Sequence, residues 1–126
     1  MQVGKILIKL PKKVRKGEVF KLRFIIFHPM ETGRRRDPVT GELIPAHYLT
    51  RVRVYYDETL VNDVTTSPAL SRNPYFMFKL KAVKSGTIRV EAEDNKGNRW
   101  SASAPLRVED SEQAVRDAKK KWESLK

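Results

Sequence analysis

The sequence predicts an all-β protein: an immunoglobulin-like antiparallel β-sandwich of about seven strands over residues 1–109, followed by a C-terminal α-helix over residues 110–126. A chain of 126 residues has room for one domain of ordinary size. Hydrophobic residues make up 40% of it, which is enough for a core. Apolar and polar residues alternate along most of the chain, and turn-forming residues separate the alternating runs.

Alternation with a period of two predicts the strands. In the clearest run, Val52, Val54 and Tyr56 alternate with Arg51 and Arg53. Runs of this kind, or short apolar runs, occupy residues 5–10, 20–27, 51–56, 60–65, 76–81, 88–93 and 100–108. One apolar and one polar face per run is typical of half-buried antiparallel strands.

Turn chemistry separates the runs. The pairs at 16–17 and 85–86 end in glycine and precede strands, and residues 94–97 (Asp-Asn-Lys-Gly) link the last two long strands. Gly97 can adopt the positive φ of a bulged hairpin. Pro105 has no N–H to donate, so we expect the last strand to lie at a sheet edge or to carry a bulge.

The C-terminal residues predict a helix. Asp110 or Ser111 can cap its N-terminus, and Ala114, Ala118 and Trp122 recur at helical spacing. A helix of about fifteen residues is marginal alone in water, so the apolar stripe should pack on something. Both its own sandwich and a partner protein remain open.

Composition limits the chemistry of the chain. With no cysteine, it has no disulfides, thiolate catalysis or cysteine-ligated zinc. A net charge of +11 attracts polyanions, although it also suits a domain that merely repels its own copies. No stretch approaches the roughly 20 apolar residues of a membrane helix, and the first residues lack the pattern of a secretory signal peptide.

Residues 28–48 form the longest segment without strand periodicity, and loops of this length in small domains are usually functional or disordered. His28 and His47, at its two ends, could converge, but no spacing supplies a third and fourth metal ligand. The sequence also lacks motifs of nucleophilic catalysis or nucleotide binding. We therefore predict no catalytic residues, metal or cofactor. Nucleic-acid binding through aromatic residues on a sheet face remains the alternative.

Four short motifs resemble one family. They are, in order, His28-Pro29-Met30-Glu31-Thr32-Gly33, Arg34-Arg35-Arg36-Asp37, Ile44-Pro45 and Asn73-Pro74-Tyr75-Phe76. This combination resembles the SoxZ family, the Z subunits of the sulfur-oxidising Sox thiosulfate carrier complex. The resemblance covers about residues 5–108. It departs from the family at Asp57-Glu58, where Asn-Gly is common, so the geometry of that turn should differ.

The resemblance implies a β-sandwich that is not an enzyme. It would form a heterodimer with a SoxY-type carrier subunit, whose cysteine on a flexible arm carries sulfur intermediates, and would meet other sulfur-oxidation enzymes transiently. It implies binding of neither nucleic acid nor membrane. Location in the periplasm, after export together with the partner, is also implied by the resemblance.

Partner-binding residues follow from the same motifs. We expect His28, Pro29, Met30, Glu31, Thr32, Gly33, Asn73, Pro74 and Tyr75 to face the partner or its cysteine arm. Arg34, Arg35 and Arg36 are candidates for contact with anionic sulfur species or acidic enzyme surfaces. The alternatives are that the prolines and glycine only shape turns, that Asn73 caps its own backbone, and that the arginines are simply solvated.

Overall fold

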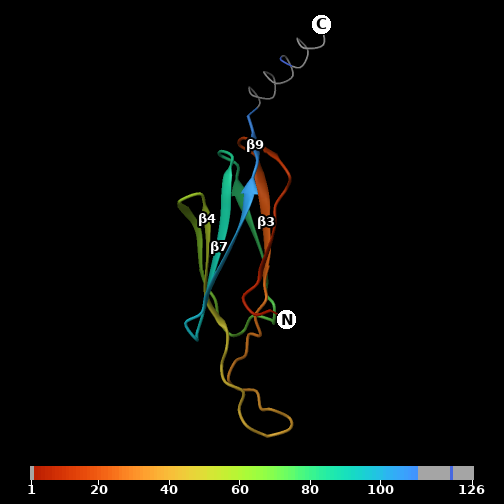
Figure 1. The fold of residues 1–126 in the computed structure, drawn as a ribbon, viewed down its shortest axis with the longest axis vertical. Coiled ribbons are helices and arrows are strands. Elements are labelled where there is room, and N and C mark those ends of the chain that lie inside the picture. Colours follow the sequence, from red (N-terminus) through yellow and green to blue (C-terminus); the bar gives the residue numbers. More distant parts are fainter. Residues whose placement is uncertain (1, 111–119, 121–126) are drawn as a thin grey trace.

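The computed structural model describes residues 2–110 and 120, and its strands form two packed layers (Figure 1). The strands are β1 (Ile6–Lys9), β2 (Val14–Arg15), β3 (Val19–Ile26), β4 (Leu49–Tyr56), β5 (Thr59–Thr65), β6 (Tyr75–Lys81), β7 (Gly86–Asp94), β8 (Arg99–Leu106) and β9 (Val108–Glu109). The predicted antiparallel β-sandwich is confirmed. The seven longer strands correspond to the seven alternating runs, except that the last run, predicted to reach residue 108, ends at Leu106 and its Val108 belongs to β9. The two-residue strands β2 and β9 were not predicted.

One sheet has the order β1-β3-β6 and the other the order β5-β4-β7-β8, and all neighbours in both are antiparallel. The short strands β2 and β9 pair in parallel. The strand that contains Pro105 is β8, which lies at the edge of its sheet, as its missing N–H predicts.

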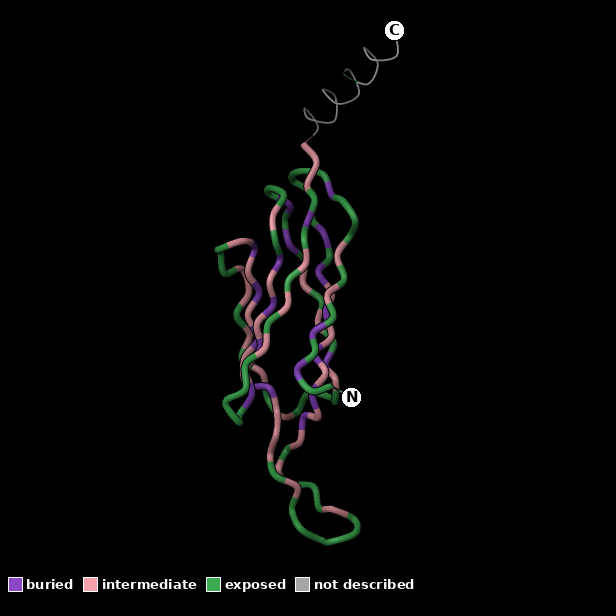
Figure 2. Tube along the Cα trace, viewed as in Figure 1, coloured by how far each residue is buried: buried purple, intermediate pink, exposed green. Residues whose placement is uncertain are grey.

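The core lies between the two sheets (Figure 2). It takes Leu22, Phe24 and Ile26 from β3 and meets them with Val52 and Val90 from the opposite sheet, all at most 1% exposed. Phe24 stacks on Phe76 of β6 with ring centroids 5.0 Å apart. The inward positions are those that the alternation predicted, because successive side chains of a strand point to opposite faces.

Two tight turns have the backbone that their residues suggest. Gly97, in the β7–β8 turn, has a φ of 81°, as predicted. Asp57, in the β4–β5 turn, has a φ of 52°, and its carboxylate accepts a hydrogen bond from Thr87 N at 2.8 Å. Aspartate tolerates this left-handed conformation better than most residues.

The predicted C-terminal helix lies, apart from Asp110 and Lys120, outside the described residues. Its capping and its apolar stripe therefore stay predictions. Within the part of the chain that the structure describes, no helix is long and apolar enough to span a membrane.

Residues 28–48 form an ordered two-stranded ribbon that projects from one end of the sandwich (Figure 1). Two antiparallel bridges join its limbs, Glu31 to His47 and Arg36 to Leu43. Further out, the carboxylate of Asp37 accepts hydrogen bonds from the backbone N–H groups of Val39 and Thr40 and so shapes the tip. We call residues 28–48 the ribbon.

Candidate functional site

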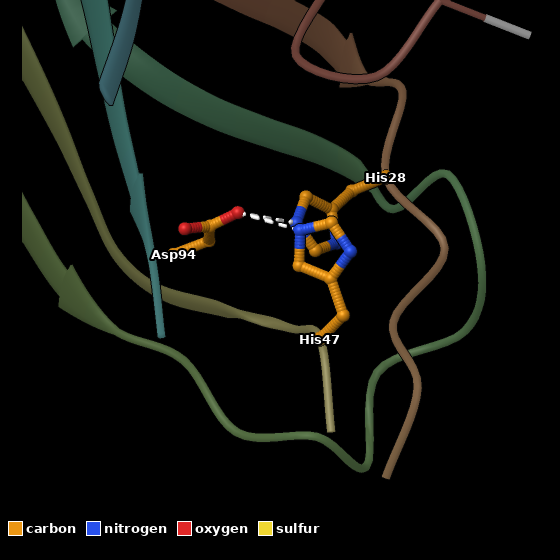
Figure 3. Close-up of side chains that lie close together, drawn as sticks. All are labelled: His28, His47 and Asp94. Atoms are coloured by element: carbon orange, nitrogen blue, oxygen red, sulfur yellow. Dashed lines mark hydrogen bonds and ion pairs between the residues drawn. The ribbon is translucent and has the colours of Figure 1, made fainter. Parts of the chain in front are cut away.

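Three side chains meet at the base of the ribbon (Figure 3). His28 follows β3, His47 precedes β4, and Asp94 is the last residue of β7. The Nε2 atoms of both histidines lie within hydrogen-bond distance of Asp94 Oδ2, His28 at 3.2 Å and His47 at 2.7 Å. We call these residues the His–Asp–His cluster. It ties both limbs of the ribbon to the β7–β8 hairpin.

Asp94 is the centre of this cluster. Its side chain is fully buried, and Oδ2 also accepts a hydrogen bond from Asn98 Nδ2, while Oδ1 accepts from the backbone N–H groups of Lys96 and Asn98. Burial by itself raises the pKa of Asp94, but the hydrogen bonds from Asn98 and the two histidines outweigh it and lower the pKa to about 2. Asp94 is therefore a carboxylate at neutral pH, with five donors directed at it.

The protonation state of His28 follows from its other contact. Its Nδ1 accepts a hydrogen bond from the backbone N–H of Met30 at 3.2 Å, so the ring proton must sit on Nε2 and point at Asp94. Burial, only partly opposed by the hydrogen bond to Asp94, lowers the pKa of His28 below 6.5. His28 is thus a neutral imidazole in a fixed tautomer.

Met30, two residues after His28, also helps to hold the base of the ribbon in place. It is buried at 6% exposure, has a φ of 54°, and its Sδ lies 3.4 Å from the backbone N–H of Leu49, which donates to it. A residue other than glycine in the left-handed region is costly, so the surrounding contacts must hold it there.

Asn73 is joined to His28 by a reciprocal pair of hydrogen bonds. His28 N donates to Asn73 Oδ1 at 3.1 Å, and Asn73 N donates to His28 O at 2.9 Å. Two of the motifs that resemble the SoxZ family therefore lie in direct contact. Asn73, which has a φ of 52°, accepts a hydrogen bond from the backbone of His28. The alternative, that the Asn73 side chain caps its own backbone, does not describe this contact.

The middle of the ribbon is held by its own contacts. Arg35 forms a bidentate ion pair with Glu31, at 2.6 and 3.2 Å. Gly33, with a φ of 84°, lies against Ala46, and a Cβ at this glycine would sit 3.0 Å from the Cβ of Ala46. Arg36 donates to the carbonyl of Gly41 at 2.9 Å.

The expected partner-binding residues, taken with the three candidate arginines, therefore divide into two groups. His28, Met30 and Pro74 are buried and position the backbone. Tyr75, Thr32, Arg34, Arg35 and Arg36 are exposed, and Pro29, Glu31, Gly33 and Asn73 are half-buried. The exposed and half-buried residues are the ones available to a partner.

A metal ion fits the His–Asp–His cluster poorly, although one donor atom of each residue lies within 4.8 Å of the others. A metal needs a ring nitrogen with a free lone pair, but His28 Nε2 carries the proton because Nδ1 accepts from Met30. Asp94 Oδ2 already accepts three hydrogen bonds. The donor set is that of a hydrogen-bonded clasp.

Catalysis of the serine-protease kind finds no nucleophile at this cluster. Among residues 2–110, no serine or threonine hydroxyl is hydrogen-bonded to either histidine. The two histidines were predicted to be able to converge, whereas the roles of Asp94 and Asn98 were not predicted. The sequence feature that could have indicated Asp94 and Asn98 is the turn at 94–98, which was interpreted only as a hairpin. An aspartate at the start of such a turn can accept hydrogen bonds from the turn backbone with one oxygen and from a distant side chain with the other.

The fold and the site define a thiol-free β-sandwich with an ordered ribbon clasped at its base. Residues 8–105 match the sequence model of the family described as sulphur oxidation protein SoxZ, and the chain belongs to this family. Membership places it in the sulfur-oxidation system that the family description names. The predicted resemblance to this family is thereby confirmed. None of the curated proteins compared with the chain matches its sequence.

Solved structures share the fold. Superoxide reductase (neelaredoxin) from Ignicoccus hospitalis is 21% identical, with 82% of this chain and 80% of that chain covered at a TM-score of 0.59. A putative superoxide reductase from Thermotoga maritima is also 21% identical, with 82% and 85% covered at 0.63. The sulfur carrier protein SoxY from Chlorobium limicola f. thiosulfatophilum is 15% identical, with 82% and 78% covered at 0.58. At these identities the likeness concerns the fold alone.

Proposed function

We propose that this chain is the non-catalytic subunit of a sulfur-carrier complex, and that it binds a cysteine-bearing SoxY-type partner during thiosulfate oxidation. Family membership supports the system. The sequence supports the division of roles, because sulfur is carried covalently on a thiolate and these 126 residues contain no cysteine. The same proposal places the working complex in the periplasm.

The ribbon is the observation that carries this proposal. It extends beyond the sandwich, and its surface is largely exposed (Figure 2). Val39, at the tip, is 91% exposed and Leu43 is 53% exposed. A projecting element of this kind presents its exposed side chains where a partner protein can reach them.

Rigidity at the base makes the ribbon suited to binding. Ordering a mobile loop on association costs free energy, whereas the His–Asp–His cluster and the ion pair between Arg35 and Glu31 hold this ribbon in one conformation beforehand. The role of the buried cluster is therefore to preorganise the exposed residues that meet the partner.

A groove beside the ribbon offers a place for an extended segment. It has a volume of about 340 Å³ and lies between Thr32 and Arg34 on the ribbon and residues 67–69, which precede β6. Its arginine suits an anionic group. A flexible arm that presents a modified cysteine would bring both an extended backbone and, when loaded with an oxidised sulfur species, a negative charge.

Co-expression with a tagged SoxY-type subunit tests the proposal. The two chains should co-purify in equal amounts, and Tyr75→Ala or Arg34→Ala should weaken the complex, because both side chains are exposed on the proposed binding end. Ser101→Ala, on the exposed face of β8, is the matched control and should leave binding unchanged. Failure of the folded wild-type chain to bind the partner would exclude the proposed function.

A further inference from the structure

The outward residues of strands β1, β3 and β6 include five cations and no carboxylate. The register places these residues side by side: Leu7, Lys9, Val19, Lys21, Arg23, Ile25, Tyr75, Met77, Lys79 and Lys81. Among the described residues, none of these five lysines and arginines has a carboxylate within 4.0 Å. We call this surface the basic face.

The register also sets like charges directly opposite one another on the basic face. Lys9 pairs with Arg23 across β1 and β3, and Lys21 pairs with Lys79 across β3 and β6. Like charges at directly opposed positions of an antiparallel pair are destabilising. A surface arranged against the stability of the free protein indicates a function for those charges.

The other sheet shows the contrast. On the outer face of β5-β4-β7-β8, Arg53 lies 3.5 Å from Glu93, Arg99 lies 3.6 Å from the same carboxylate, and Arg89 lies 3.3 Å from Glu91. Arg51 pairs with Asp63. The charged side chains of that face form ion pairs within the chain, whereas the cations of the basic face have no carboxylate partner among the described residues.

Apolar side chains occupy the end of the basic face nearest the ribbon. Leu7 is 46% exposed, Tyr75 is 58% exposed and Met77 is 43% exposed, and the half-buried Ile25 lies between Leu7 and Tyr75 in the register. This patch is continuous with the cations further along the strands. Its apolar area would be covered in a protein interface.

A groove of about 520 Å³ lies at the other end of the basic face, between residues 9–14 and residues 18–23 at the start of β3. Four cations line it, Lys9, Lys13, Lys21 and Arg23, and its single carboxylate is that of Glu18. Glu18 lies 3.9 Å from Arg15, and Lys13 lies 3.8 Å from Glu109, so three lining cations keep no partner among residues 2–110. The groove suits acidic side chains.

We propose that the basic face is the docking surface for an acidic protein surface with an apolar patch at one end, and that the SoxY-type partner supplies it. This inference rests on the proposed function, because the partner is the one named there. Carboxylates of the partner would relieve the opposed pairs Lys9–Arg23 and Lys21–Lys79, and its apolar patch would cover Leu7, Tyr75 and Met77. Tyr75 joins this surface to the ribbon end, so the two form one continuous interface.

A protein fits this face better than a nucleic acid does. Single strands bind to sheets through several aromatic side chains on which bases stack. The basic face exposes one aromatic residue, Tyr75, among aliphatic side chains. Phe76 and Phe78 point from the same strand toward the core, where Phe24 packs against both.

Paired variants separate binding from stability. Lys21→Gln/Lys79→Gln removes two positive charges from the basic face, and Lys84→Gln/Arg99→Gln removes two elsewhere, where each cation has a carboxylate partner. We expect the first variant to bind the SoxY-type subunit at least about tenfold more weakly at low salt. Its thermal unfolding midpoint should stay the same or rise, since repulsion is relieved. The control should bind within about twofold of wild type.

The outcomes are distinguishable by titration calorimetry of the two purified subunits. If wild type binds and the basic-face variant binds equally well, the docking surface is wrong while the proposed function stands. If wild type does not bind the partner at all, the proposed function falls and this inference falls with it. Tight retention of a short DNA duplex at 150 mM NaCl, abolished by Lys21→Gln/Lys79→Gln, would also overturn the assignment to a protein.

Discussion

Replacement of Asp94 by asparagine tests the His–Asp–His cluster most sharply. The variant keeps the shape of the side chain but removes its charge and replaces one acceptor oxygen by an NH₂ group. Five N–H groups point at the present carboxylate. Whichever way the amide is oriented, its NH₂ group faces at least two of these donors. His28 cannot move its proton from Nε2 to Nδ1, because Nδ1 accepts the hydrogen bond from Met30 N.

The magnitude follows from two routes. Each buried donor left without an acceptor costs about 1–3 kcal/mol, so two such donors cost about 2–6 kcal/mol. The pKa of Asp94, about 2 against 3.8, corresponds to about 2–3 kcal/mol of stabilisation by the charged form at neutral pH. We therefore expect Asp94→Asn to lower the free energy of unfolding by about 3 kcal/mol.

Urea unfolding at pH 7 measures this loss. Asp63→Asn is the matched control: it removes the same charge from a carboxylate that pairs with Arg51 at the protein surface, and its loss should be clearly smaller. In addition, an NMR titration of the Asp94 carboxyl carbon should give a midpoint near 2. Because the folded pKa is depressed, the contribution of Asp94 is present above pH 4 and is lost as the pH falls toward 2. An Asp94→Asn protein as stable as wild type, or a midpoint near 3.8, would refute the reasoning.

Three further predictions concern the same end of the molecule. Gly4→Ala should destabilise the fold by more than about 2 kcal/mol in thermal unfolding, because the φ of Gly4 is 89° and the new Cβ would lie 2.0 Å from the indole of Trp100. Gly41→Ala is the control: the φ of Gly41 is also positive (74°), but no atom lies within 4 Å of the new Cβ. Its cost in thermal unfolding should be only about 1 kcal/mol. Asn73→Ala should cost about 1–3 kcal/mol in urea unfolding, since it leaves the His28 N–H without its acceptor, and an unchanged midpoint would contradict that role. The His28 ring should titrate below pH 6.5 by NMR. As the pH drops, the imidazole is protonated in the unfolded chain before it is protonated in the folded one, so the contribution of His28 to stability should fall below pH 6.5. A titration midpoint above 6.5 would contradict the buried neutral imidazole.

The strands could be predicted from the sequence because each has one face in the core. The inward positions in β4 and β7, such as Val52 and Val90, recur with period two, and a shift of one residue would turn the whole strand over. The pair β2 and β9 could not be found in this way. Each has two residues, which is too short for a period, and their pairing joins segments more than ninety positions apart, from Val14 to Val108.

The site was only half predictable. The long segment between His28 and His47 stands out by length and by its prolines and glycines, and both histidines were recognised as able to meet. That the segment is an ordered ribbon depends on backbone bridges such as Glu31 to His47, which have no sequence period. The partner of the histidines, Asp94, comes from a turn that local reasoning explained without a distant role.

Membership of a motif did not distinguish exposed positions from buried ones. His28 and Met30 belong to the motif that resembles the SoxZ family, yet both are buried and act on the backbone around them. The residues of a family motif can serve contact with a partner or correct packing of the fold. Burial separates the two, and burial depends on tertiary structure.

Hydrogen–deuterium exchange of the chain, alone and mixed with an equimolar SoxY-type subunit, tests the central claim most directly. Binding through the ribbon end and the basic face predicts slower exchange in residues 28–48 and in the segment around Tyr75, with unchanged exchange at the outer edge strand β8. No slowing anywhere in the mixture would contradict the claim that this chain works by binding that partner. Slowing confined to β8 and its neighbours would contradict the assigned surface.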